Sequence, residues 1–73
     1  MGSVEPREQF ARNLRQQRER LGYSQEELGA RCNLHRTEIG LLERAGRDPR
    51  LATIVRLARG LGVAPADLLT GIK

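Results

Sequence analysis

The chain has 73 residues and a net charge of +4, and arginine supplies all but one of its thirteen basic residues. This basic balance favours nucleic acid or an acidic surface as partner, although many small domains carry a similar charge. With one cysteine, the chain cannot form an internal disulfide. One cysteine and one histidine are also too few to bind zinc. No apolar run approaches the roughly 20 residues of a membrane span. We therefore expect one small soluble domain, with no metal, no cofactor and no membrane contact, in the cytoplasm.

The first helical pattern defines the beginning of the domain. Residues 1–5 carry no pattern, and we expect them to form a flexible tail. Pro6 suits the first turn of a helix, and Gly22 ends the run of helical spacing that follows it. The chain after this first helix continues in helical patterns. The sequence predicts a folded domain over residues 6–70 and a C-terminal tail over residues 71–73.

Residues 24–43, SQEELGARCNLHRTEIGLLE, form two short helical patterns joined by a turn. Ser24 and Glu27 have the spacing of a capping box, in which each side chain bonds the other residue's backbone amide. Asn33 is one of the few residues besides glycine that tolerates the left-handed conformation ending a helix. We expect helices over about residues 25–32 and 35–44. Two short helices joined by such a turn have the helix-turn-helix layout.

This stretch resembles the helix-turn-helix of the Cro/CI-type repressor family, also called XRE-like. The positions that carry the resemblance are Gln25, Leu28, Gly29, Cys32, Asn33, Ile39 and Leu42. It extends over about residues 10–69, nearly the whole chain. The resemblance implies an all-α fold, a five-helix lambda-repressor-like DNA-binding domain whose helices 2 and 3 form the helix-turn-helix.

Two opposite charges stand on inward faces of the predicted helices. Arg18 lies on the apolar stripe of the first helix, and Glu43 follows Ile39 by four residues on the third. This placement predicts a partly buried ion pair that joins the two helices, and the family resemblance implies the same pair. We therefore interpret Arg18 as structural and not as a DNA contact.

The third helix is the candidate recognition helix, because an α-helix fits the major groove and its N-terminal residues reach base edges. The expected base contacts are Arg36, Thr37, Glu38, Gly40 and Leu41. Arg36 could bind guanine through two hydrogen bonds, and Thr37 could contact a base edge or a thymine methyl group. Glu38 could accept from cytosine or could stay solvated. Gly40 would permit close approach to the duplex. Leu41 would be exposed in the free protein, and a thymine methyl group in a DNA complex or a partner protein could cover it.

A second set of residues is expected to contact the DNA backbone. The start of the second helix offers free amides and a partial positive charge to a phosphate. The loop after the third helix concentrates arginines, and the family resemblance implies that this loop grips the backbone. The predicted phosphate contacts are Ser24, Gln25, His35, Arg44, Arg47 and Arg50.

The remaining expectations concern the later helices. Ala45 stands where relatives usually have glycine, which predicts a third helix that ends about one residue late. Asp48 followed by Pro49 resembles a helix cap and a first helical residue. The predicted apolar face of the fourth helix is Leu51, Ile54, Val55, Ala58 and Leu61, and a short fifth helix is expected to begin near Pro65.

These patterns favour sequence-specific binding of double-stranded DNA by a transcriptional regulator, with repression as the expected mode. We expect a palindromic operator bound by a homodimer in a bacterial or phage cytoplasm, associated with the nucleoid. Leu69 and Ile72 could form the self-contact or could cover the edge of the core. The alternative is a helical protein-interaction module, such as an antitoxin, that has lost DNA readout. No candidate set of catalytic residues is present, so we do not expect an enzyme.

Overall fold

The computed structural model describes residues 5–73, and within this range the chain forms helices and no strand. Residues 1–4 of the tail predicted over residues 1–5 lie outside the described residues, and Glu5 is the N-cap of the first helix. The helices are α1 (Pro6–Arg20), α2 (Gln25–Cys32), α3 (Arg36–Glu43), α4 (Leu51–Leu61) and α5 (Pro65–Leu68). The prediction of an all-α, five-helix fold is confirmed. None of these helices combines the length and the hydropathy needed to cross a membrane.

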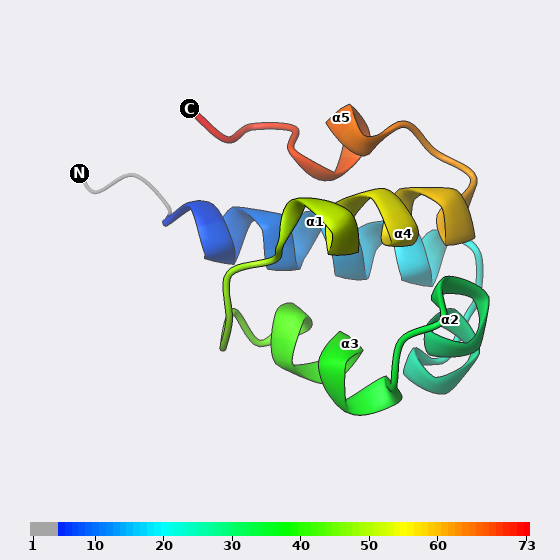
Figure 1. Ribbon diagram of the computed structural model, residues 1–73. Coiled ribbons are helices and arrows are strands. Elements are labelled where there is room, and N and C mark those ends of the chain that lie inside the picture. Colours follow the sequence, from blue (N-terminus) through cyan, green and yellow to red (C-terminus); the bar gives the residue numbers. More distant parts are fainter. Residues whose placement is uncertain (1–4) are drawn as a thin grey trace.

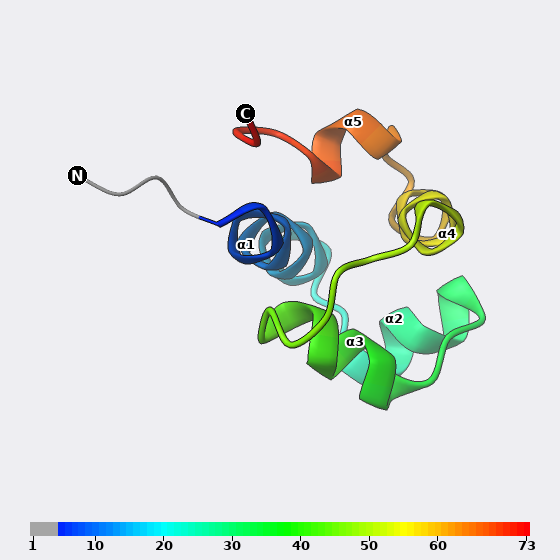
Figure 2. The ribbon, with the colours of Figure 1, turned by 60° about the vertical axis from the view of Figure 1, so that its left-hand side comes forward.

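The helices enclose the core from several sides (Figures 1 and 2). In Figure 2, α1 and α4 are seen nearly end-on, with α5 on one side of the pair and α2 and α3 on the other. Contacts of α3 with α1, of α2 with α4 and of α5 with both long helices close this arrangement. The side chains of the core are Phe10, Leu14, Leu28, Cys32, Ile39, Leu42, Ile54, Leu57, Ala58, Leu61 and Leu68. Helices α2 and α3 thereby form one outer layer of the molecule.

The helix-turn-helix forms where the local sequence predicts it. The Ser24 hydroxyl accepts from the Glu27 amide at 3.0 Å, and the Ser24 amide donates to the Glu27 carboxylate at 2.8 Å. Asn33 ends α2 in the left-handed region, with φ of 57°. A Cβ at Gly29 would lie 2.5 Å from the carbonyl oxygen of Leu34, so only glycine allows the turn to pack this closely. The capping box and the left-handed cap are both confirmed.

The capping box has a pH dependence that can be measured. The hydrogen bond from the Ser24 amide lowers the pKa of the Glu27 carboxyl below its usual value. A carboxyl whose pKa is lower in the folded state stabilises the fold above its unfolded pKa, about 4.3, and loses that contribution as the pH falls. The wild-type protein should therefore have a higher melting temperature than Glu27→Gln at pH 6. This difference should vanish toward pH 3. A difference independent of pH would contradict this role of the Glu27 charge.

The end of α3 corrects the expectation of a longer helix. Helix α3 ends at Glu43, and Ala45 itself adopts the left-handed conformation, with φ of 57°. The amides of Ala45 and Gly46 donate to the carbonyl oxygens of Leu42 and Leu41 at 3.2 and 2.9 Å. Packing and these hydrogen bonds hold the turn at residue 45 although alanine disfavours the conformation.

Ala45→Gly is therefore expected to stabilise the protein. A non-glycine residue in the left-handed region costs about 1–2 kcal/mol, and the larger unfolded-state entropy of glycine offsets part of the gain. The free energy of unfolding should rise by roughly 1 kcal/mol, measured by urea denaturation. Ala64→Gly is the matched control, because Ala64 has an ordinary negative φ. An equal loss of stability in both variants would contradict the proposed strain.

Helix α4 begins later than predicted, and its predicted apolar face is confirmed in part: Ile54, Ala58 and Leu61 are buried. Arg50 is the N-cap residue and the helix starts at Leu51, so Asp48 and Pro49 precede the helix and do not cap it. Leu51 is 77% exposed, whereas Leu57, which was missed, is fully buried. Apolar residues on two overlapping faces of this helix, one with Leu51 and one with Leu57, both recur every three or four residues. Contacts with α2 and α5 decide which of the two packs against the core.

One buried polar residue joins the two ends of the domain. Asn13 of α1 is 7% exposed and donates to the carbonyl oxygens of Leu68 and Thr70 at 2.9 and 2.8 Å. Its side-chain oxygen accepts from Gln9 at 3.0 Å. Asn13 therefore satisfies the free carbonyl groups at the end of α5, and Ile72 packs against the core just beyond them.

Candidate nucleic-acid interface

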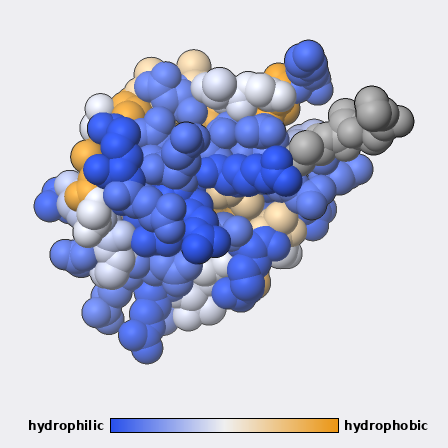
Figure 3. Space-filling view, turned by 180° about the vertical axis from the view of Figure 1, so that it is seen from behind, coloured by the Kyte–Doolittle hydropathy of each residue, from blue (hydrophilic) through white to orange (hydrophobic). Residues whose placement is uncertain are grey.

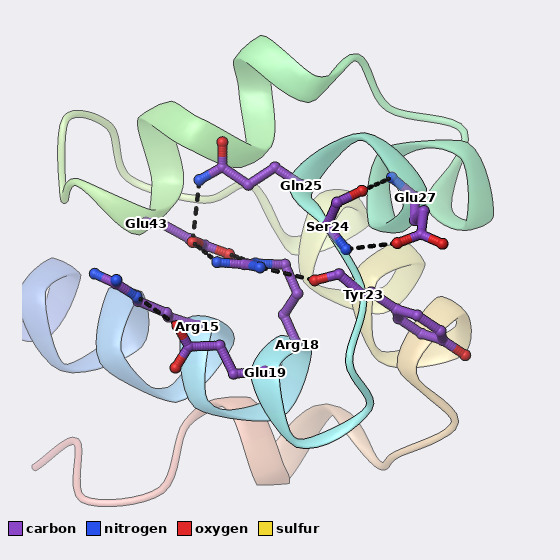
Figure 4. A network of polar contacts seen from close by, with 8 residues as sticks. All are labelled: Arg15, Arg18, Glu19, Tyr23, Ser24, Gln25, Glu27 and Glu43. Atoms are coloured by element: carbon purple, nitrogen blue, oxygen red, sulfur yellow. Dashed lines mark hydrogen bonds and ion pairs between the residues drawn. The ribbon is translucent and has the colours of Figure 1, made fainter.

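The candidate recognition helix α3 is anchored to α1 by a buried ion pair (Figure 4). Arg18 binds both carboxylate oxygens of Glu43, with Nε–Oε2 of 2.6 Å and Nη2–Oε1 of 2.9 Å. The remaining guanidinium nitrogen of Arg18, Nη1, donates to the carbonyl oxygen of Tyr23 at 2.8 Å. Gln25, the first residue of α2, donates to the same carboxylate at 3.2 Å. Helices α1, α2 and α3 therefore meet at one carboxylate.

Burial makes this network a structural anchor. The Arg18 and Glu43 side chains are only 13% and 4% exposed. The hydrogen bond to Glu43 raises the pKa of the Arg18 guanidinium above its usual value, so the arginine stays charged. The Arg18 guanidinium binds two carboxylate oxygens and a backbone carbonyl inside the domain. It therefore holds α3 in place and is not available to DNA.

The N-terminal end of α3 presents its side chains to solvent. The Arg36 side chain is 65% exposed, and its nearest carboxylate, that of Glu26, lies 3.4 Å away. Thr37 is exposed beside it, and the Thr37 amide donates to Nδ1 of His35 at 3.0 Å. His35 is thus the N-cap of α3 and precedes the helix, whose predicted start was one residue too early. Arg36 and Thr37 lie where an incoming base edge could meet them.

Gly40 and Leu41 lie deeper than predicted. Gly40 is buried, and a Cβ there would lie 3.1 Å from Nη1 of Arg44 and 3.5 Å from the side-chain oxygen of Gln25. Leu41 is half-buried, because its side chain packs over Gly46 in the turn after α3. The expectation of an exposed Leu41 is wrong. The exposed leucine that favoured a protein-interaction surface on α3 is therefore absent.

Residues 44–50, the loop after α3, are held on two sides by ion pairs. Arg47 binds Glu38 of α3 at 2.5 Å, and Asp48 binds Arg7 of α1 at 3.1 Å. A contact between Glu38 and cytosine would require the first of these pairs to open. Arg50 is exposed at the start of α4. The loop therefore has a defined position between α3 and the start of α1.

The other predicted phosphate contacts differ in their surroundings. The Ser24 hydroxyl and the side-chain amide of Gln25 each have a partner inside the protein, although Ser24, Glu26 and Glu27 are exposed at the start of α2. The Arg44 guanidinium lies over Gly40, next to Gln25. Arg44 therefore lies beside the start of α2. Arg47 and Arg50 line a polar concavity with Glu38, whereas His35 lines another one with Arg36.

A metal site, a reactive cysteine or an apolar surface for a protein partner in the described part of the chain would indicate a different function. Among residues 5–73, no group of three His, Cys, Asp or Glu side chains could hold a metal ion. Cys32 is buried, and burial raises the pKa of its thiol, which disfavours the reactive thiolate. The face drawn in Figure 3 is mostly hydrophilic, with small and separate hydrophobic areas. That face offers no broad apolar surface for a protein partner.

Comparison with known proteins identifies the family. A family model described as helix-turn-helix matches residues 14–68. The chain is 43% identical over 61 residues to control protein C.BamHI of Bacillus amyloliquefaciens, covering 82% of this chain and 75% of the relative. It is 41% identical over 69 residues to control protein C.SmaI of Serratia marcescens, covering 92% and 82% of the two chains. The crystal structure of the restriction-modification controller protein C.AhdI from Aeromonas hydrophila superposes with a TM-score of 0.83 at 35% identity, over 85% of this chain and 94% of that one. The chain belongs to the helix-turn-helix family of the XRE type and is a DNA-binding regulator of transcription, not an enzyme.

Proposed function

We propose that the protein reads a specific DNA sequence with α3 in the major groove. The observation that carries this proposal is the exposed pair Arg36 and Thr37 at the N-terminal end of a helix anchored by the Arg18–Glu43 ion pair. Arg36 reads guanine through its forked guanidinium, and Thr37 contacts the neighbouring base. Three further residues of α3 contribute less to readout. The Glu38 side chain is paired with Arg47, Gly40 has no side chain, and Leu41 is half-buried.

The backbone contacts set the register of the protein on the duplex. Phosphate contacts of this kind position a protein and carry no sequence information. We assign them to Ser24, Gln25, His35, Arg44, Arg47 and Arg50. Support comes from their placement at the exposed start of α2, at the start of α3 and in the loop after it. Residues 6–70 are then the DNA-binding domain of this chain.

A homodimer on a palindromic operator would double the few base contacts of one domain. A groove of about 470 Å³ lies between the start of α1, the loop after α3 and the C-terminal residues. Its lining includes Leu69, which is 41% exposed, together with Ile72, Pro49 and Phe10. A second copy docked here would bring the two loops, and therefore the two recognition helices, to the same side of the dimer. Half-site centres would lie about 34 Å apart.

Leu69→Glu tests this self-contact. A charge at the apolar groove should convert a dimer to a monomer in analytical ultracentrifugation and weaken binding to a full palindrome far more than to one half-site. Ala66→Glu is the matched control, because Ala66 is exposed on α5 outside the groove lining. Equal oligomeric states for wild type and Leu69→Glu would contradict the proposed interface.

The regulator is proposed to act as a repressor in the cytoplasm, bound to the nucleoid, by occupying a site that polymerase needs. The relatives named as control or controller proteins support a regulatory role. Selection of bound duplexes from a random pool tests the proposed function. We expect one enriched palindrome with a guanine in each half-site. Recovery of unrelated sequences would overturn sequence-specific binding.

A further inference from the structure

Two basic side chains of the proposed interface already have an anionic partner, and Arg47 is paired at a shorter distance than Arg36. Arg47 of the loop lies 2.5 Å from the Glu38 carboxylate, although half of its side chain is exposed. The Glu38 side chain is 23% exposed. Both residues line a polar concavity of about 570 Å³, together with Asp48, Arg50 and Thr53. The guanidinium therefore faces the region assigned to DNA while it is bound to the protein's own carboxylate.

We propose that Glu38 is an internal competitor of the DNA phosphate for Arg47. This inference rests on the proposed function. A carboxylate and a phosphate present the same charged oxygen acceptors to a guanidinium. When the duplex binds, Arg47 leaves Glu38 for a phosphate oxygen, and the Glu38 carboxylate loses its partner. Glu38 thus lowers affinity for every sequence and does not read a base.

The exchange of partners changes how binding depends on salt. Each phosphate neutralised by a free cation adds about −0.9 to the slope of log K against log[salt]. Arg47 is not free, and the carboxylate it leaves behind attracts a cation from solution. This uptake cancels the counterion that Arg47 releases from the duplex. The slope of the wild-type protein should therefore lack the contribution of one phosphate contact.

Arg15 and Glu19 offer a matched control pair. Their ion pair, at 3.1 Å, also joins an exposed arginine to an exposed carboxylate, but both residues belong to α1 and neither belongs to α3 or its loop. Glu19→Gln changes the net charge by the same amount as Glu38→Gln. Any effect of net charge alone appears equally in both variants.

The test measures dissociation constants of the full chain at several salt concentrations, with a selected duplex and a random duplex of equal length. Glu38→Gln should bind both duplexes roughly fivefold more tightly at about 0.1 M salt. Its slope should be steeper than that of wild type by about 0.9. Glu19→Gln should match wild type. In an Arg47→Ala background, Glu38→Gln should have no further effect.

Three outcomes would overturn the inference while leaving the proposed function intact. One is unchanged or weaker binding by Glu38→Gln. Another is tightening that persists without Arg47, which would indicate simple repulsion between Glu38 and the duplex. The third is a change confined to one base pair of the selected duplex, which would make Glu38 a reader of cytosine. Failure of wild type to bind either duplex at low salt would overturn the proposed function together with the inference.

Discussion

Arg18→Ala is expected to destabilise the protein by about 3–5 kcal/mol, because it leaves the Glu43 carboxylate buried without its partner. The Glu43 side chain is 4% exposed and receives two hydrogen bonds from Arg18. A domain of this size has a total stability near the lower end of the usual 5–15 kcal/mol. The variant should therefore be largely unfolded near 37 °C, as measured by circular dichroism during heating.

Two further variants separate the buried pair from charge in general. Arg15→Ala removes an exposed pair with Glu19 and should cost about 1 kcal/mol or less. Arg18→Met combined with Glu43→Leu removes both charges and should recover most of the stability lost in Arg18→Ala, because no buried charge is left unpaired. Equal stability of Arg18→Ala and Arg15→Ala would contradict the anchoring role of this ion pair.

The second large effect is expected on DNA readout. Arg36→Ala should lower the preference for one guanine in each half-site by about 1–3 kcal/mol, because two hydrogen bonds to that base are lost. The melting temperature should stay close to that of wild type, since the Arg36 side chain is 65% exposed. Competition binding with duplexes that differ only at that base pair measures the discrimination directly.

Arg50→Ala serves as the control for Arg36→Ala. Arg50 is exposed at the start of α4 and is assigned to the backbone. Its replacement should weaken binding to all duplexes alike and reduce the salt slope by about one. If Arg36→Ala behaved in the same uniform way, α3 would not be the reading element.

Features set by local chemistry were predictable from the sequence. The capping box of Ser24 and Glu27 and the left-handed cap at Asn33 depend on residues close in the chain. The Arg18–Glu43 ion pair joins residues far apart, but a charge on an apolar helix face has few ways to be satisfied except by an opposite charge. These features were sufficient to predict the helix-turn-helix and the inward placement of Ile39, Leu42 and Glu43 on α3, but not the burial of Gly40.

Features set by the packing of whole elements could not be predicted. Leu51 and Leu57 belong to overlapping helical stripes, and only the contacts of α4 decide that Leu57 is buried. Ala45 keeps a left-handed turn against its own preference, because surrounding hydrogen bonds fix the chain there. The pairing of Glu38 with Arg47 depends on the path of the loop, which no periodic pattern specifies.

Titration of the isotopically labelled protein with its selected duplex, followed by NMR, tests the central claim most directly. If α3 and its loop bind DNA, the largest shift changes should fall on the side chain of Arg36 and on the backbone amides of residues 36–37, 44–48 and 50, with smaller changes at the start of α2. Shift changes concentrated on α4 and α5, or none at low salt, would contradict the account.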